Sequence, residues 1–145
     1  MGLRLGDQAP NFRTGTTRGH LDFHEWKRDS WCLLFSFPKI FGSISTTELI
    51  EICKLQNKFL SHHTRILGLT CGLGSFKDDQ NNDRTIQRWF NDIKDIENID
   101  IEFPIIIDSE RKIATLYDLL DYQDALNVDD SYLPLTCRST FLIDK

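Results

Sequence analysis

The chain has 145 residues and a net charge of −5, with 40% hydrophobic and 27% charged residues, which suits one compact domain with a single core. The negative charge argues against nucleic-acid backbones as partners, and no apolar run approaches the roughly 20 residues needed to cross a bilayer. The amino terminus lacks the long apolar segment of a secretory signal, so a cytoplasmic protein is expected.

The first half of the chain predicts a hairpin followed by a strand, a helix and a strand. Residues 1–27 place turn residues around short apolar pieces, which indicates an N-terminal hairpin region. The apolar run 31–37 predicts a buried strand, and 46–61 predicts a helix. One apolar face of that helix is expected to carry Leu49, Ile52, Cys53, Phe59 and Leu60. Residues 66–69 predict a second buried strand.

The second half continues the alternation. The polar stretch 76–83 is expected to be an exposed loop. The next segment is an amphipathic helix, marked by Ile86, Trp89, Phe90 and Ile93. Residues 103–107 predict a third strand. Ser109 is expected to cap a helix that carries Ile113, Leu116 and Leu120. Residues 136–143 predict the last strand.

This order of elements predicts an α/β fold with a partly parallel sheet. In such sheets ligands and reacting groups gather beyond the carboxyl ends of the strands, where helices begin. The loop 38–45 follows the first buried strand and precedes its helix. It is therefore the first place to look for an active site.

The four cysteines are Cys32, Cys53, Cys71 and Cys137, and no two of them form a Cys-x-x-Cys pair. Their spacing argues against a zinc site and against a dithiol redox centre. In an intracellular protein they are expected to be free and mostly buried thiols, with Cys71, at the end of the second strand, the most exposed of them.

Several segments resemble the peroxiredoxin family, and most closely its one-cysteine, peroxiredoxin-6-like type. The residues 35–49, FSFPKIFGSISTTEL, are similar to the family's active-site loop, whose pattern is Pro-x-x-x-Thr-x-x-Cys. Further similar blocks lie at 5–12, 23–26, 29–31, 103–106 and 133–138. The similarity runs in order from residue 3 to 145 and is interrupted mainly by an apparent insertion around 76–84.

The resemblance implies a thioredoxin-like α/β sandwich, with a central mixed sheet flanked by helices, as a single domain over 1–145. Relatives continue past the position of Lys145 with another core strand, a helix and a small C-terminal domain. The fold is therefore expected to be incomplete at its C-terminus, whether the chain is a fragment or a natural product. The apolar surface left uncovered in that case leads us to expect a homodimer.

In the family, a cysteine thiolate attacks the peroxide and a threonine hydroxyl aligns it. An arginine and a helix N-terminus stabilise the negative charge, and a proline shields the site from water. The resemblance assigns the proline to Pro38, the arginine to Arg138 and the acidic residue after the cysteine to Glu48. Ser45 falls at the position of the peroxidatic cysteine and Gly42 at that of the threonine.

Two further positions depart from the subgroup, because Phe37 replaces a common histidine and Ile40 replaces a usual aspartate. Ser45 is not expected to act as a nucleophile, since the loop 38–47 contains no histidine to serve as its base. An alcohol also has no counterpart to the sulfenic acid of peroxide turnover. The sequence Ser45-Thr46-Thr47-Glu48 is instead interpreted as a capping box that starts the helix.

The leading hypothesis is therefore a peroxiredoxin homologue without normal peroxidase activity, acting by binding. One alternative is a thiol-dependent peroxidase that reduces hydrogen peroxide and organic hydroperoxides through another cysteine and a thiol reductant. A third hypothesis is an acyl hydrolase using Ser30, with His24 and Asp144, although the glycines of a Gly-x-Ser-x-Gly elbow are absent. None of these hypotheses calls for a cofactor, a metal ion or a nucleic-acid partner.

Overall fold

The computed structural model describes residues 2–72, 82–129 and 131–145. A hairpin of β1 (Arg13–Thr16) and β2 (Gly19–Asp22) leads into the short helix α1 (Phe23–Lys27) and the strand β3 (Trp31–Ser36). The long helix α2 (Ser43–Ser61) and the strand β4 (Thr64–Thr70) follow. The second half contains α3 (Asn82–Glu97), β5 (Ile105–Ile107), α4 (Lys112–Leu116) and β6 (Ser139–Ile143).

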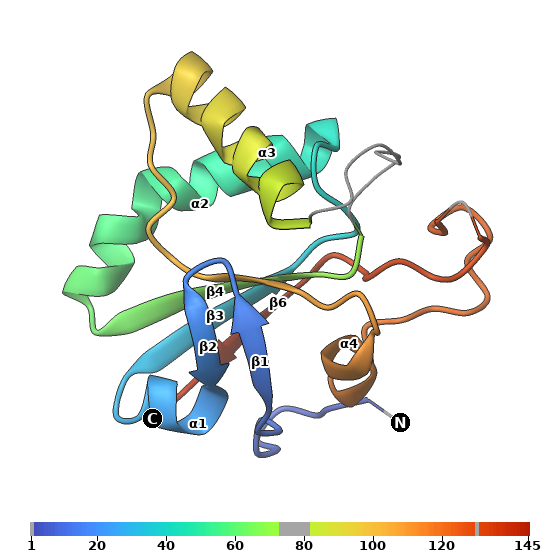
Figure 1. The fold of residues 1–145 in the computed structure, drawn as a ribbon. Helices are drawn as coiled ribbons and strands as arrows, with labels where there is room; N and C mark the ends of the chain where they lie inside the picture. The colour runs from blue at the N-terminus through green and yellow to red at the C-terminus, as the bar shows by residue number, and fades with distance from the viewer. Residues whose placement is uncertain (1, 73–81, 130) are drawn as a thin grey trace.

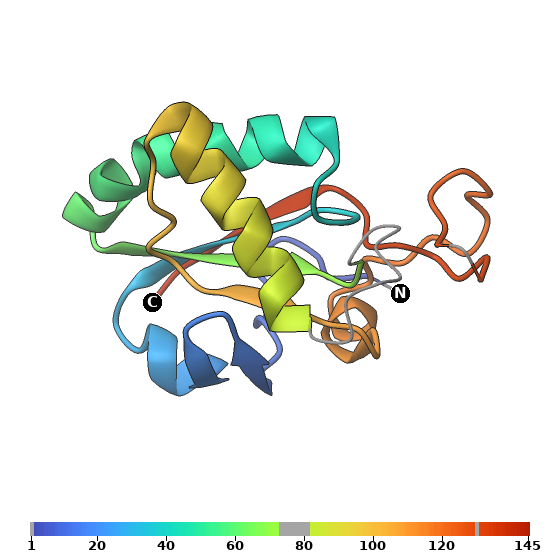
Figure 2. The ribbon, with the colours of Figure 1, turned by 45° about the horizontal axis from the view of Figure 1, so that its top comes forward.

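The central sheet has four strands in the order β5-β4-β3-β6. Strands β3, β4 and β5 run parallel, whereas β6 pairs antiparallel with β3, so the sheet is mixed as expected. Helices α2 and α3 cover one face, and the hairpin, α1 and α4 lie on the other (Figures 1 and 2). This arrangement is the expected α/β sandwich.

Each face of the sheet buries its own apolar cluster. Under α2 and α3, the cluster contains Phe35, Phe37, Ile40, Leu49, Cys53, Ile66, Ile86, Trp89, Ile93, Phe103 and Ile105. On the opposite face, it includes Phe12, Phe23, Cys32, Leu34, Leu67, Leu69, Ile106 and Tyr117. Because successive strand residues point to opposite faces, the apolar run of β3 supplies both clusters, as its lack of alternation predicted.

The helix α2 begins three residues earlier than predicted, so the interpretation of Ser45 as the capping residue is wrong. Gly42 is the N-cap, and no side chain caps the helix. The Gly42 carbonyl accepts both the backbone N–H and the hydroxyl of Thr46, each at 2.8 Å. The backbone bond is the first of the helix. Ser45 therefore lies within the first turn. Leu60 is exposed rather than on the buried face.

The helix α4 is also shorter than predicted, and Ser109 does not cap it. Asp108 lies before it, and its two carboxylate oxygens accept the N–H groups of Lys112 and Ala114 at 3.0 and 2.7 Å. Arg111 takes the N-cap position in the left-handed region. Leu116 is exposed, and Leu120 lies beyond the helix in an isolated bridge to Thr136.

The remaining differences concern boundaries. Most of the predicted polar loop 76–83 lies outside the described residues, but Asn82 and Asp83 belong to α3. The last strand begins at Ser139, since Thr136 makes only the isolated bridge to Leu120. No helix among the described residues is long and apolar enough to cross a membrane.

Candidate active site

The candidate site lies where the carboxyl ends of β3 and β4 meet the start of β6. Ser36, the last residue of β3, is paired with Leu69 on one side and with Ser139 on the other. Its hydroxyl donates to the Cys137 carbonyl at 2.6 Å and so fixes the chain just before Arg138. The topology thus brings the loop after β3, the end of β4 and Arg138 to the same end of the sheet.

The loop after β3 is tied to the end of β4. The Phe37 N–H donates to the Leu69 carbonyl at 3.0 Å, and the Ile40 N–H donates to the Gly72 carbonyl at 3.2 Å. Lys39 forms a parallel bridge with Gly72. This approach is so close that a Cβ on Gly72 would lie 2.5 Å from the Pro38 carbonyl oxygen. Gly72 therefore helps to position Pro38, because a larger residue would collide with the Pro38 carbonyl. The sequence alone did not indicate this role.

Phe37 and Ile40, the two apolar departures from the subgroup, fill the core under α2 and α3. Both side chains are almost completely buried. The Phe37 ring packs against Trp89 of α3, with ring centroids 5.7 Å apart. These positions therefore offer no polar group to a reaction at this end of the sheet.

Trp89 also fixes the first turn of α2. Its indole N–H donates to the Thr46 hydroxyl at 3.0 Å, and that hydroxyl donates to the Gly42 carbonyl at 2.8 Å. Its ring lies 6.1 Å from that of Phe41, whose φ of 64° is unusual for a bulky residue. The sequence marked Trp89 only as part of an apolar helix face and missed this role.

Ser45 is buried in this first turn, where its side chain is only 2% exposed. Among the described residues, its hydroxyl is the one buried side-chain oxygen or nitrogen without a hydrogen-bond partner. An unpaired buried hydroxyl typically costs about 1–3 kcal/mol. A Cβ on Gly42 would lie 3.6 Å from this hydroxyl, an ordinary contact. Because residue 42 is a glycine, no side chain from that position contacts the Ser45 hydroxyl.

Arg138 reaches α2 one turn beyond Ser45. Its Nη1 lies 3.1 Å from Glu48 Oε2, and both side chains are partly exposed. Glu48 follows Ser45 by three residues, which places the two side chains on the same side of the helix. The structure therefore places Gly42 and Ser45 at the start of α2, with Pro38 in the loop before them, and joins Arg138 to the next turn through Glu48.

The thiols lie away from this turn or are buried. Cys71 is buried rather than exposed, and its Sγ accepts the Thr136 N–H at 3.2 Å. Burial raises the pKa values of Cys32 and Cys53 to about 12. Cys137 is the one partly exposed cysteine. Its pKa is raised by burial first, and then by the negative charge of Asp121.

The hydrogen bonds of the three residues of the hydrolase hypothesis go to other residues and not to one another. The Ser30 hydroxyl donates to the Lys27 carbonyl at 2.6 Å, while the His24 ring bonds the Ala9 carbonyl at 2.7 Å. The Asp144 carbonyl accepts from Lys27 Nζ at 2.6 Å. The arrangement does not support an acyl hydrolase.

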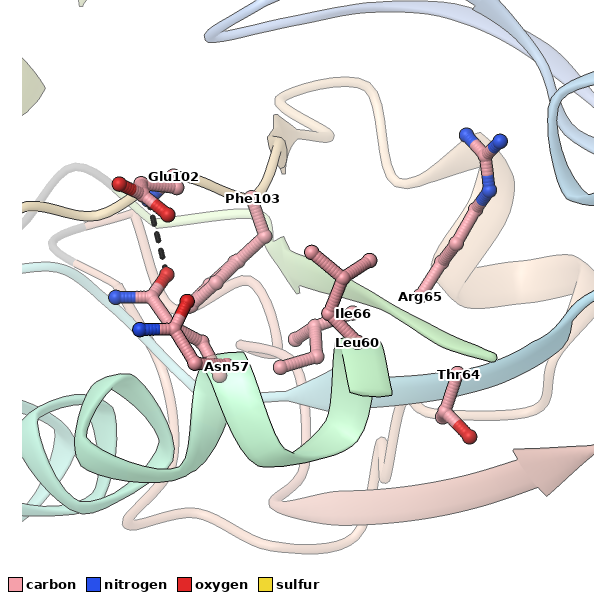
Figure 3. A pocket seen from close by; sticks show the side chains of 8 residues that line it. Asn57, Leu60, Thr64, Arg65, Ile66, Glu102 and Phe103 are labelled. Atoms are coloured by element: carbon pink, nitrogen blue, oxygen red, sulfur yellow. Dashed lines mark hydrogen bonds between the residues drawn. The ribbon is translucent and has the colours of Figure 1, made fainter. Parts of the chain in front are cut away.

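A pocket of about 130 Å³ lies at the other end of α2 and is separate from this site (Figure 3). Its apolar lining comes from Leu60, Ile66 and Phe103. The Gln56 amide on its rim is already engaged, since it bonds the Asp100 carbonyl and the Glu102 N–H. Arg65 is directed away from the pocket and lies over the Trp26 ring. Among the described residues, no cluster of His, Cys, Asp or Glu could hold a metal ion.

Comparison with known proteins identifies the class of protein to which this chain belongs. The model of the AhpC/TSA family matches residues 5–145, so the chain belongs to that family. It is 37% identical over 143 residues to the mitochondrial peroxiredoxin PRX1 of Saccharomyces cerevisiae, covering 98% of this chain and 51% of that protein. It is 36% identical over 145 residues to peroxiredoxin-6 of Homo sapiens, covering 97% of this chain and 59% of that protein.

Solved structures agree with this assignment. A cysteine-to-serine mutant of peroxiredoxin 6 from Arenicola marina superposes with a TM-score of 0.82 at 33% identity, covering 99% of this chain and 60% of the other. These similarities confirm the peroxiredoxin family, its one-cysteine type and the thioredoxin-like fold. The chain spans about half to three fifths of the length of these relatives.

Proposed function

We propose that this chain is a peroxiredoxin homologue without normal peroxidase activity, which acts by binding. In this proposal Ser45 stands at the position of the peroxidatic cysteine and Gly42 at that of the aligning threonine. Pro38, Glu48 and Arg138 are the family's proline, acidic residue and arginine around that position. The observation that carries the proposal is the buried Ser45 hydroxyl without a hydrogen-bond partner.

An oxygen nucleophile at this place would need a base to take its proton, because an alcohol is a weak nucleophile while it remains protonated. The Ser45 hydroxyl has no such partner. The positive end of the α2 dipole and Arg138 would suit a thiolate, but a neutral hydroxyl gains little from them. The geometry therefore favours a retained scaffold over a serine enzyme.

The alternative, peroxide reduction through another cysteine, is less well supported. A thiol peroxidase needs an accessible thiol whose pKa is lowered, since the thiolate is the nucleophile. Cys137 is partly exposed, but burial and the negative charges of Asp121, Asp124 and Asp118 raise its pKa. A cytoplasmic location also belongs to the proposal. The free thiols fit a reducing compartment, but one yeast relative is named as mitochondrial.

Peroxide consumption in the presence of dithiothreitol tests the proposed function. We expect the chain to consume hydrogen peroxide at the rate of the reductant alone, because no described thiol combines exposure with a lowered pKa. The Cys137→Ser variant serves as the matched control and should give the same rate. Catalytic consumption by the parent that is lost in Cys137→Ser would support the thiol peroxidase instead.

We also propose that the chain self-associates through β6. The opposite edge of the sheet is covered, because Thr17 donates its N–H to the Ile105 carbonyl and accepts the Ile105 N–H on its hydroxyl, both at 3.0 Å. In contrast, β6 pairs only with β3 among the described strands and contains neither a charge nor a proline. Such an unprotected edge invites pairing with a second copy.

Light scattering at micromolar concentration is expected to give the mass of a dimer. Leu142 is 64% exposed on β6, so Leu142→Lys should place a charge at the proposed contact and yield a monomer. Leu116→Lys, at a 48% exposed position of α4, is the control and should remain dimeric. A parent chain that stays monomeric across this range would refute association through β6.

A further inference from the structure

The loop between α4 and β6, of which the structure describes residues 118–129 and 131–135, projects from the body of the protein, and these residues are drawn in orange and red in Figures 1 and 2. It carries four large apolar side chains that are exposed to solvent. Tyr122 is 76% exposed, Leu126 95%, Tyr132 85% and Leu133 50%. Single exposed apolar residues are ordinary, but several on one projecting loop are typical of a contact surface.

The exposure of these side chains does not come from an unstructured chain. At the base of the loop, isolated bridges join Leu120 to Thr136 and Val128 to Pro134. Arg111 holds the returning half of the loop, because its Nε donates to the Pro134 carbonyl at 2.7 Å and its Nη2 donates to Asp129 Oδ2 at 3.0 Å. A loop fixed in this way loses little conformational entropy when a partner binds.

The charge of the loop indicates what kind of partner it fits. The sequence from 118 to 137 contains five aspartates and neither lysine nor arginine. Arg111 pairs with one of them, Asp129. The negative charge also reaches Cys137, since Asp121, Asp124 and Asp118 contribute, after burial, to its raised pKa.

This charge disfavours a second copy of the chain as the occupant. Two such loops face to face would bring ten aspartates together, and like charges across an interface oppose association. A segment with lysines or arginines would meet complementary charge, while its apolar side chains would cover the tyrosines and leucines.

We propose that the loop 118–135 is a docking surface for a cationic protein segment that presents apolar side chains between its basic residues. The aspartates attract the segment over roughly a Debye length, about 8 Å at physiological salt. The contacts of Tyr122, Leu126, Tyr132 and Leu133 supply most of the affinity, as buried aromatic and aliphatic anchors do at interfaces. This surface is distinct from the first turn of α2 and does not depend on whether Ser45 is inert.

The test uses a fluorescein-labelled peptide of lysine and leucine at helical spacing, titrated with the full chain and followed by anisotropy. The same pattern with glutamate in place of lysine is the second probe. We expect the lysine peptide to bind and to shift the amide resonances of 118–135, and the glutamate peptide not to bind.

Two double variants separate the apolar contribution from the charge. Leu126→Ser with Tyr132→Ser should weaken binding by about tenfold or more, since two anchors are lost. Asp121→Asn with Asp124→Asn keeps the oxygens that accept the N–H groups of Gln123 and Leu126, but removes two charges. It should weaken binding several-fold, with a smaller effect at high salt. If the serine variant does not fold, this second variant alone decides.

The matched controls change the same residue types elsewhere on the surface. Leu60→Ser with Ile96→Ser replaces two other exposed apolar residues, and Asp95→Asn with Glu97→Gln removes two charges from α3. Both controls should bind the lysine peptide like the parent. Failure of the lysine peptide to bind, or equal losses in controls and loop variants, would overturn the proposal. Loss of self-association in the serine variant would overturn it in favour of a second copy.

Discussion

The double variant Gly42→Thr with Ser45→Cys is expected to react with hydrogen peroxide about 10²- to 10³-fold faster than Ser45→Cys alone. Under the proposed assignment, Ser45→Cys places sulfur in the first turn of α2, where the helix N-terminus and Arg138 favour the thiolate. That single variant should already react faster than the parent. It remains slow because Gly42 provides no hydroxyl to align the peroxide.

The structure permits the second substitution. The φ of Gly42 is −62°, which threonine adopts without strain, and a Cβ there makes ordinary contact with the Ser45 side chain at 3.6 Å. Stopped-flow measurement of sulfenic acid formation compares the variants, with Gly42→Thr alone as the control that lacks the thiol. Equal inertness of the single and double variants would show that the turn or Arg138 is misplaced for this chemistry.

Gly72→Ala is expected to lower the free energy of unfolding by about 1–3 kcal/mol, because overpacking at a tight backbone approach forces the chain to shift. The added Cβ would lie 2.5 Å from the Pro38 carbonyl oxygen and 2.9 Å from Lys39 Cβ. The shift would fall on the loop that leads into α2. Urea denaturation followed by circular dichroism measures the change.

Gly15→Ala is the matched control for this prediction. Gly15 also lies in extended chain, in β1, but a Cβ there meets no atom within 4 Å. The unfolding free energy of the Gly15→Ala variant should stay within about 0.5 kcal/mol of that of the parent. Equal stability of the two alanine variants would contradict the tight approach of the Pro38 loop to β4.

The sequence predicted the elements well where apolar periodicity was strong. The uninterrupted run of β3, the face of α3 and the alternation of strands and helices each gave the right element. The starts of the helices were predicted less well. Gly42 and Arg111 hold the N-cap positions without a cap from their own side chains, and the first N–H groups of α4 bond Asp108 instead. The usual Ser/Thr signal therefore pointed wrongly to Ser45 and Ser109.

The candidate site was predictable only through its place beyond β3 and through the family resemblance. The structure places Gly42 and Ser45 in the first turn of α2 and joins Arg138 to the following turn through Glu48. Two contributions were not visible in the sequence, because each depends on contacts between distant segments. Trp89 reaches Thr46 across the interface of α2 and α3, and Gly72 lets the loop approach β4. The exposure of Cys71 was misjudged for the same reason, since Thr136 covers it from the far end of the chain.

The central claim is that this peroxiredoxin homologue has lost the thiol chemistry of its site. It is tested most directly by exposing the chain to low hydrogen peroxide with a sulfenic-acid probe and mapping the label by mass spectrometry. The claim predicts that Cys32, Cys53, Cys71 and Cys137 all label slowly, at the rate of unactivated thiols, while Ser45→Cys adds a faster label at position 45. Rapid, stoichiometric labelling of one native cysteine in the parent would contradict it.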